Sequence, residues 1–222
     1  LTGIVAVAAG YRPSLALDQN GHVWAWGDAT NGAVNASGNQ LYARMVMMDA
    51  ATPLSNVGAV TAGGYFSVAL DKTDGSVWFW GLNKFSEIRD MAPTSSTAGS
   101  LISSFLVPQK MWAGMSGSHL GMLGDGFGNL KSAEYLTNIV AVEAGYDSLR
   151  MLRQDGSVFA LGENTAGTLG TGYNNTAYSA VVREYNPYPV AAGQRYTELG
   201  YRRLTDVLSL DAGYYHAVAQ VR

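Results

Sequence analysis

The sequence contains no cysteine and only three histidines among its 222 residues. The lack of cysteine excludes disulfide bonds and thiolate metal sites. No run of about 18 apolar residues occurs, so we predict no membrane-spanning helix. Charged residues make up only 14% of the chain and the formal net charge is −3. This balance argues against a nucleic-acid binder, which needs clustered lysine and arginine to neutralise phosphates.

Glycine is abundant where charge is scarce. The chain holds 27 glycines in 222 residues, which is about 12%, whereas glycine usually makes up roughly 7% of a protein. Hydrophobic residues make up 47% of the chain, which is ample for a core. Many tight turns between short strands give this profile, whereas long surface helices would bring more charge. The composition therefore indicates an all-β protein.

One sequence unit occurs three times in clear form. The copies are "VAAGYRPSLALDQNGHVWAWG" (7–27), "VTAGGYFSVALDKTDGSVWFWG" (60–81) and "VEAGYDSLRMLRQDGSVFALG" (142–162). Each copy has a strand ending in Ala-Gly, a second apolar strand, an Asn-Gly or Asp-Gly turn and a third strand ending in glycine. Alternation at a spacing of two predicts strands, and Asn-Gly or Asp-Gly steps favour hairpin turns. Units of roughly 50 residues with three or four strands are typical of propeller blades.

Two weaker copies follow the same plan. One consists of the segments 111–123 and 128–132 and lacks the tryptophan pair. The other, 210–221, stops before its turn. We predict one β-propeller domain over 1–222, partial or irregular, with about four to five blades visible. The copies are predicted near 4–35, 57–90, 108–137, 139–172 and 204–222, with long insertions at 28–56, 82–108 and 163–206. Because the last copy is incomplete and Leu1 is not methionine, we expect a piece of a longer protein. Alternatively, a partner supplies the missing strands, or the ring is small and irregular.

These copies resemble the regulator-of-chromosome-condensation repeat, whose pattern joins Ala-Gly, His-Ser, Asp-Gly-x-Val, Trp-Gly-x-Asn and Gly-x-Leu-Gly. "LGENTAGTLGTG" (161–172) fits the end of that pattern closely, and "WGDATNGAVN" (26–35) fits it loosely. His216 takes the histidine position of this pattern. In the three clear copies, we assign the same position to Pro13, Phe66 and Leu149, which replace the histidine. The resemblance implies a β-propeller, usually of seven blades, in a family of exchange factors, enzyme inhibitors and surface proteins. We expect a divergent bacterial or phage member.

The tryptophan pairs and the glycines after them are interpreted as structural positions of the repeat. We expect one tryptophan of each pair to pack between neighbouring blades and the other to face the opposite side of its sheet. The glycines end a strand where the backbone must turn. The predicted structural residues are Trp24, Trp26, Gly27, Trp78, Trp80, Gly81, Gly162 and His216.

The residues that could carry catalysis are few and scattered. His22, His119 and His216 do not lie at metal-ligand spacing. "GMSGS" (114–118) misses the nucleophile-elbow pattern by one position. We find no pair of carboxylates suited to acid–base chemistry. The sequence therefore predicts no enzyme, no metal site and no cofactor.

Tyrosines recur after each clear Ala-Gly and predict an aromatic rim on one side of the propeller. A tyrosine-rich surface is typical of protein-binding sites. Alternatively, each tyrosine covers the adjacent blade and hydrogen-bonds a loop carbonyl. The long insertions are a further candidate for recognition. The candidate partner-binding residues are Tyr11, Arg12, Tyr65, Phe66, Tyr146, Tyr214 and Tyr215.

Our leading hypothesis is a non-enzymatic module that binds a protein or a surface glycan, with no nucleic-acid partner. We expect it in an exposed assembly, such as a phage tail fibre, a pilus tip or a surface adhesin, together with further chains of that assembly. Its expected location is outside the cell, on the cell surface or on a virion. The alternatives are a secreted propeller that inhibits an enzyme through its aromatic rim, and a guanine-nucleotide exchange factor for a small GTPase.

Overall fold

The computed structural model describes residues 1–83, 104–111, 135–163, 167–170, 183–189 and 204–222. These residues form strands and one 3-10 turn, η1 (Thr30–Gly32). The first sheet contains β1 (Ile4–Ala9), β2 (Pro13–Asp18), β3 (Val23–Gly27) and β4 (Gln40–Met45). The second contains β5 (Val57–Ala62), β6 (Phe66–Asp71), β7 (Val77–Leu82) and β8 (Ser104–Lys110). The third contains β9 (Ile139–Ala144), β10 (Ser148–Arg153), β11 (Val158–Glu163) and β12 (Arg183–Pro189), and β13 (Val207–Ala212) pairs with β14 (Ala217–Val221).

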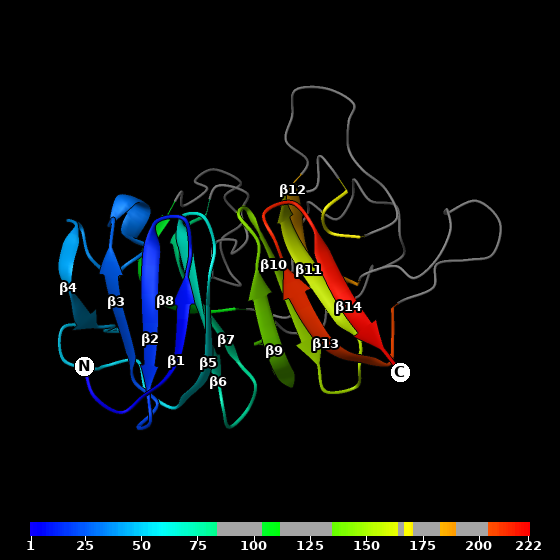
Figure 1. Cartoon of the computed structure of the whole chain (residues 1–222), viewed down its shortest axis with the longest axis horizontal. Coiled ribbons are helices and arrows are strands. Elements are labelled where there is room, and N and C mark those ends of the chain that lie inside the picture. The colour runs from blue at the N-terminus through cyan, green and yellow to red at the C-terminus, as the bar shows by residue number, and fades with distance from the viewer. Residues whose placement is uncertain (84–103, 112–134, 164–166, 171–182, 190–203) are drawn as a thin grey trace, which may run out of the picture.

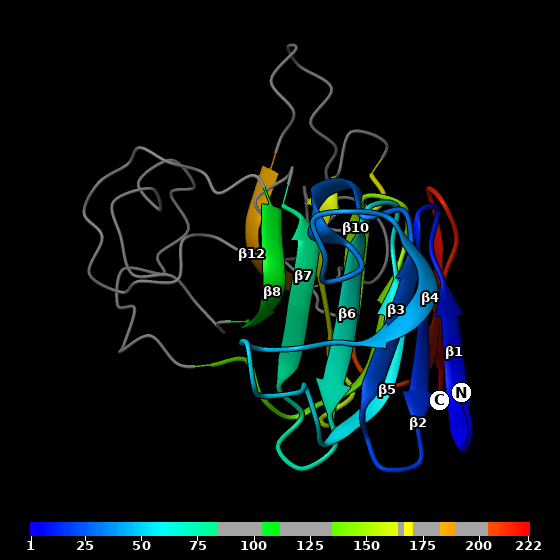
Figure 2. The same cartoon turned by 90° about the vertical axis from the view of Figure 1, so that its left-hand side faces the viewer.

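Each four-stranded sheet is an antiparallel meander whose strands follow chain order. Figure 1 shows the sheets following one another from left to right, with β13 and β14 at the C-terminal end. In Figure 2, β8 and β12 lie on one side of the molecule, and β1 and both chain ends lie on the other. The predicted all-β fold of repeated antiparallel units is confirmed.

The three segments predicted as long insertions each contribute a fourth strand. β4, β8 and β12 pair with β3, β7 and β11 respectively. Sequences such as "QLYARM" in β4 lack the glycine-bounded alternation of the other strands, so the repeat pattern missed them. β8 also occupies the start of the weak copy predicted near 108–137. Residues 112–134 lie outside the described part of the chain, and a blade there stays a prediction.

Opposite faces of each sheet pack against different neighbours. Val23 and Ala25 of β3, both 0% exposed, share a hydrophobic cluster with Trp80 of β7, also 0% exposed. Phe79, on the other face of β7, belongs to the cluster that contains Leu161 of β11. A strand thus sends alternate residues to the preceding and the following sheet.

Both tryptophans of a pair lie on the same face of their sheet, so the prediction that they face opposite sides is wrong. Residues two apart in a strand share a face. Trp78 and Trp80 both pack in the cluster between the first and second sheets. Trp24 and Trp26 lie on the corresponding face of the first sheet, where they are half-buried. Trp24 donates its indole N–H to the Asp18 carboxylate at 3.1 Å.

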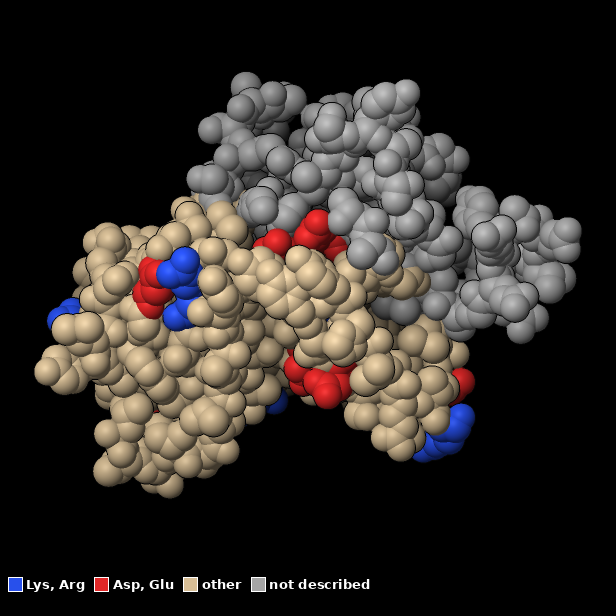
Figure 3. Space-filling model, turned by 45° about the horizontal axis from the view of Figure 1, so that its top comes forward, with Lys and Arg blue, Asp and Glu red and all other residues tan. Residues whose placement is uncertain are grey.

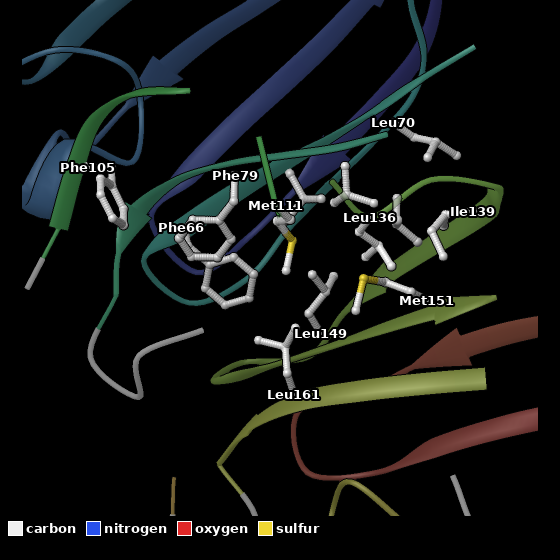
Figure 4. Packing of buried hydrophobic residues seen from close by; sticks show 13 residues of the cluster. Phe66, Leu70, Phe79, Phe105, Met111, Leu136, Ile139, Leu149, Met151 and Leu161 are labelled. Carbon is white, nitrogen blue, oxygen red and sulfur yellow. The ribbon is translucent and has the colours of Figure 1, made fainter. Parts of the chain in front are cut away.

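A large apolar cluster of the described residues lies between the second and third sheets (Figure 4). Phe66 and Phe79 stack at 5.1 Å between ring centroids, with an interplanar angle of 18°. Phe66 is 2% exposed. Its prediction as a partner-binding residue is therefore wrong, because β6 directs this ring into the core instead of toward the rim.

The glycine of each Ala-Gly marks an equivalent turn in all four sheets. Its N–H donates to the carbonyl three residues later, and these carbonyls belong to Pro13, Phe66, Ser148 and His216. Ser148, rather than the predicted Leu149, therefore takes the histidine position of the third repeat. A Cβ atom at Gly213 would meet the His216 ring at 2.3 Å, and one at Gly63 would meet the Phe66 ring at 2.2 Å. The glycine leaves room for the ring that folds over it.

Trp80→Ala tests the packing between the first two sheets. We expect a loss of about 3–5 kcal/mol in the free energy of unfolding, because a fully buried indole is replaced by a cavity. Trp26→Ala is the matched control at the same position of the first sheet, where part of the ring meets solvent, and its loss is clearly smaller. Urea denaturation measures both variants. Equal losses would contradict the described packing.

Gly75→Ala tests the contact between the turn of the second sheet and the third sheet. Gly75 has φ +67°, and a Cβ atom there would lie 2.5 Å from the Ile139 carbonyl oxygen. A left-handed conformation costs a non-glycine residue about 1–2 kcal/mol, and the backbone collision adds to that loss. Gly38→Ala is the control, since a Cβ atom at Gly38 meets nothing within 4 Å. A melting temperature of Gly75→Ala equal to that of Gly38→Ala would count against this contact.

Candidate functional site

The turns between the first and second strands of successive sheets are hydrogen-bonded to one another. Tyr11 donates its backbone N–H to the Gly63 carbonyl at 3.2 Å, and Gly64 donates to the Tyr146 carbonyl at 2.7 Å. Tyr146 in turn donates to the Tyr214 carbonyl at 3.4 Å. Because consecutive turns are joined in this way, residues far apart in the sequence meet at one end of the sheets, the upper end of Figure 1.

Five tyrosine rings meet at these turns, and we call Tyr11, Tyr65, Tyr146, Tyr214 and Tyr215 the tyrosine cluster. The Tyr146 ring lies 5.5 Å from Tyr11 and 5.9 Å from Tyr65, both edge-on, and it stacks on Tyr214 at 4.2 Å. Tyr11 and Tyr65 are 6.0 Å apart, and Tyr215 lies edge-on to Tyr214 at 4.2 Å. The three separations among Tyr11, Tyr65 and Tyr146 lie within the roughly 4.5–7 Å of attractive aromatic pairs, and Tyr214 and Tyr215 approach their neighbours more closely.

The cluster exposes much of its aromatic surface. Tyr11 is 64% exposed, Tyr214 48% and Tyr215 60%. Tyr65 and Tyr146 are half-buried between the other rings. The tyrosines thus pack on one another across neighbouring sheets and still present aromatic surface to solvent; their role in partner binding stays a prediction.

Arg12 lies at the first-sheet end of the cluster. Its guanidinium carbon is 5.1 Å from the Tyr11 ring centroid and 5.4 Å from that of Tyr65, within the range of a cation–π contact. The same guanidinium pairs with the Asp28 carboxylate at 2.5 Å. Asp28 also accepts the backbone N–H of Thr30 at 2.8 Å. The arginine is thus held between aromatic rings and an acid.

The hydroxyl groups of the cluster form a chain of hydrogen bonds. The pKa of Tyr65 is lowered because its hydroxyl oxygen accepts from Tyr146 and from Arg12. The pKa of Tyr146 is raised because its hydroxyl donates to Tyr65. At the other end, the hydrogen bond with Tyr214 raises the pKa of Tyr215. Neighbouring hydroxyls therefore differ in acidity, and Tyr65 is the most acidic of these three.

The structure brings together every predicted partner-binding residue except Phe66. The hydrogen bond from the Ala-Gly glycine to the residue three positions later aligns the four turns. By this alignment Tyr65 and Tyr215 lie two residues after that glycine, whereas Tyr11, Tyr146 and Tyr214 lie one residue after it. Two adjacent turn positions therefore supply the rings.

Sequence reasoning missed two of the three acidic residues beside the cluster, Asp28 and Glu163. Asp28 follows Gly27, and Glu163 follows Gly162, so each is the first residue after the glycine near the end of a third strand. Asp147 directly follows Tyr146. Comparing the residue after this glycine in each copy was the signal that could have found Asp28 and Glu163.

Among the residues that the structure describes, no three His, Asp or Glu side chains come together as a metal site requires. The same part of the chain contains no helix long and apolar enough to cross a membrane.

Tyr146→Phe tests the hydrogen-bond chain. We expect the pKa of Tyr65 to rise toward 10, its unperturbed value, because the Tyr146 hydroxyl that stabilises the phenolate is lost. Arg12→Leu also raises this pKa, because it removes both a hydrogen bond to the Tyr65 hydroxyl and a nearby positive charge. A pH titration of tyrosine carrying ¹³C at Cζ, followed by NMR, measures both changes. Arg44→Leu is the control, and a Tyr65 pKa that responds equally to all three variants would refute the network.

The regulator of chromosome condensation (RCC1) repeat model matches residues 4–33 of this chain. The chain is 28% identical over 223 residues to the human protein named "Probable E3 ubiquitin-protein ligase HERC6", covering 98% of this chain and 17% of that protein. It is 36% identical over 77 residues to human E3 ubiquitin-protein ligase HERC2, covering 35% of this chain and 2% of that protein. The chain thus spans less than a fifth of the curated relatives it matches.

Solved structures show the same fold. Prp20p from Saccharomyces cerevisiae matches with a TM-score of 0.59 at 21% identity, over 99% of this chain and 43% of that one. The crystal structure of Kap60 bound to yeast RCC1 (Prp20) matches with a TM-score of 0.57 at 21% identity, over 98% of this chain and 41% of that chain. Human WBSCR16 matches with a TM-score of 0.53 at 20% identity, over 100% of this chain and 59% of that one.

The matched repeat covers the first copy, and the later copies repeat its turns and its hydrogen bonds position by position. The solved neighbours share the succession of antiparallel sheets. Repeat, register and fold together make this chain similar to the RCC1-repeat proteins, and its fold is that of their β-propellers.

Proposed function

We propose that this chain is a non-enzymatic protein-binding module whose contact surface is the tyrosine cluster. The observation that carries the proposal is the convergence of five tyrosines from three sheets and the β13–β14 pair on one exposed surface. Tyrosine and arginine are enriched at the energetic centres of protein interfaces. Arg12, stacked on two of these rings, adds to that composition.

The backbone arrangement supports the same proposal. The turns that carry the rings are joined by hydrogen bonds across neighbouring sheets, and the rings contact one another. A side chain that is already positioned loses little conformational entropy on binding. An aromatic surface held in this way is well suited to a specific protein partner.

The solved neighbours support a protein rather than a glycan as the partner. Their titles describe yeast RCC1 (Prp20) bound to Kap60, and the binding of Prp20p to Gsp1p and histones. Membership of an exposed assembly stays a prediction, as do the enzyme-inhibitor and nucleotide-exchange alternatives.

Tyr214→Ala tests the proposed function, with Tyr42→Ala as its matched control. Tyr42 is an 81% exposed tyrosine on β4 and is not part of the cluster. The partner is first identified by crosslinking and mass spectrometry in lysate from the source organism, and its affinity is then measured by calorimetry. We expect Tyr214→Ala to lose about 1 kcal/mol or more of binding free energy, as buried interface aromatics do, while thermal melting confirms that the variant is folded at the temperature of the measurement.

The control variant keeps the affinity of the wild-type chain. If Tyr214→Ala and Tyr42→Ala bind the partner equally well, the cluster is not the contact surface and the proposal fails.

A further inference from the structure

A buried arginine stands in the third sheet at a position that is aliphatic in the first two sheets. Arg150 lies five residues after the glycine of Ala-Gly, as Leu15 and Val68 do in their repeats. The strand register agrees, because Arg150 pairs with Ala160 of β11 as Leu15 pairs with Ala25 of β3. Leu15 and Val68 are 0% exposed and belong to the apolar clusters between the sheets. Arg150 is 2% exposed, so a guanidinium takes the place of a core side chain.

This position does not need an arginine for packing. Burial disfavours the charge of Arg150 and lowers its pKa to about 10. None of the ion pairs among the described residues includes it. A buried charge without a close carboxylate stabilises a core less than an apolar side chain of similar size. The guanidinium therefore indicates a role other than filling space between sheets.

The guanidinium lies against the turn that carries Tyr146. Its Nη1 donates to the Ser148 hydroxyl at 2.9 Å, and a Cβ atom at Gly145 would lie 3.0 Å from the same nitrogen. Its Nη2 donates to the Thr168 carbonyl at 2.6 Å. Arg150 thus holds one turn of the third sheet against the segment that follows β11.

In two other repeats, an aromatic ring fills the space beside the equivalent glycine. Ring atoms of Phe66 and His216, three residues after that glycine, lie 2.2 and 2.3 Å from where its Cβ atom would be. The third repeat has Ser148 at this position, and its side chain is too small to fold over the turn. Arg150 shares a face of β10 with Ser148, because the two residues are two apart in a strand. The guanidinium therefore supplies the contact that a ring makes elsewhere.

The hydrogen bonds of Arg150 also close a network around this turn. Glu163 donates its backbone N–H to the Asp147 carbonyl at 2.9 Å, and the Glu163 carbonyl accepts from the Thr168 hydroxyl. Arg150 joins the Thr168 carbonyl back to the turn. The turn and the following segment are thus linked on both sides of Tyr146.

Tyr146 joins the two ends of the tyrosine cluster, because its ring contacts Tyr11, Tyr65 and Tyr214. A shift of its turn would therefore disturb the whole cluster. Figure 3 shows the blue atoms of the visible face mainly toward its sides, and the buried Arg150 adds almost nothing to the surface. Arg150 acts on a partner only through the turn that it holds.

We propose that Arg150 is the positioning residue of the tyrosine cluster. The inference rests on the proposed function and names the buried group that fixes the partner-binding arrangement of Tyr146. Two hydrogen bonds from one planar guanidinium set the turn on which this ring is carried. The chain keeps a charge in the core of the third sheet because the contact surface requires it, whereas the fold does not.

Arg150→Met tests the inference in the full chain, with Leu15→Met as its matched control at the equivalent position of the first sheet. Methionine is uncharged and adapts to irregular space. We expect Arg150→Met to melt at the wild-type temperature or above it, because an apolar side chain replaces a buried charge. Amide hydrogen exchange is followed by NMR. We expect the Tyr146 and Glu163 amides to exchange at least about tenfold faster in this variant, and the Tyr11 amide to be unaffected.

Leu15→Met leaves the exchange of the Tyr146 and Glu163 amides unchanged. Unchanged exchange of both amides in folded Arg150→Met would overturn the inference.

Ser148→Ala provides an arm that removes one hydrogen bond and leaves the arginine in place. We expect the Tyr146 amide to exchange at least about threefold faster in this variant. In the wild-type chain labelled with ¹⁵N-arginine, the Nη protons of Arg150 are expected to give separate, slowly exchanging NMR signals, since each nitrogen is held by its own acceptor. Rapidly averaged signals would contradict the proposed contacts even without a variant.

Binding of the partner separates this inference from the proposed function. Arg150→Met is expected to weaken that binding at least about fivefold, while Leu15→Met keeps the wild-type affinity. If Tyr214→Ala loses the partner and folded Arg150→Met retains it at full affinity, the positioning inference fails and the proposed function stands. If Tyr214→Ala retains the partner, the proposed function fails, whereas faster exchange in Arg150→Met still shows that Arg150 orders the turn.

Discussion

Consecutive sheets are joined by one backbone hydrogen bond that recurs at the start of each following sheet. Val57, Ile139 and Val207 donate their N–H groups to the carbonyls of Gly21, Gly75 and Gly156. These glycines all have positive φ, and a Cβ atom at any of them would lie within about the contact distance of the next sheet's backbone. The Asn-Gly and Asp-Gly turns therefore close a hairpin and also bind the backbone of the next sheet. The regular succession of sheets depends on the glycine of each turn serving both roles.

The tyrosine cluster follows from that succession. Once each sheet packs against the one before it, the turns at the opposite end of the sheets also come within hydrogen-bond distance. The N–H of Gly64, for example, donates to the carbonyl of Tyr146 at 2.7 Å. The rings then meet because their turns meet. The apolar faces of the sheets fix the spacing, and the turn residues are free to differ between repeats. One equivalent turn position holds a cation, a phenol and an acid in the first three sheets, namely Arg12, Tyr65 and Asp147. The charge of the surface therefore changes from one end of the cluster to the other.

The fold could be predicted from the sequence because its signals are local. Alternation in "VWAWG", an Asn-Gly step and a terminal glycine are properties of short segments, and they recur. The fourth strands were missed because their pairing is decided by β3, β7 and β11 rather than by their own sequences. The histidine position of the third repeat was misassigned to Leu149, because only the hydrogen bond from Gly145 to Ser148 sets the register of a turn. The opposite orientation assigned to the two tryptophans of a pair was an error of strand geometry.

The sequence predicted the aromatic residues of the candidate site but not the arrangement of its charged residues. A tyrosine after each Ala-Gly is visible in the sequence, and equivalence of the repeats brings the tyrosines to one end. The ion pair of Arg12 with Asp28 joins two turns of one sheet, and nothing in either segment alone predicts it. Asp147 takes the position of Arg12 in the third sheet, so the charge at this position differs from one repeat to the next. A repeat protein can thus vary the chemistry of one equivalent position from unit to unit, because the backbone that supports each position is the same.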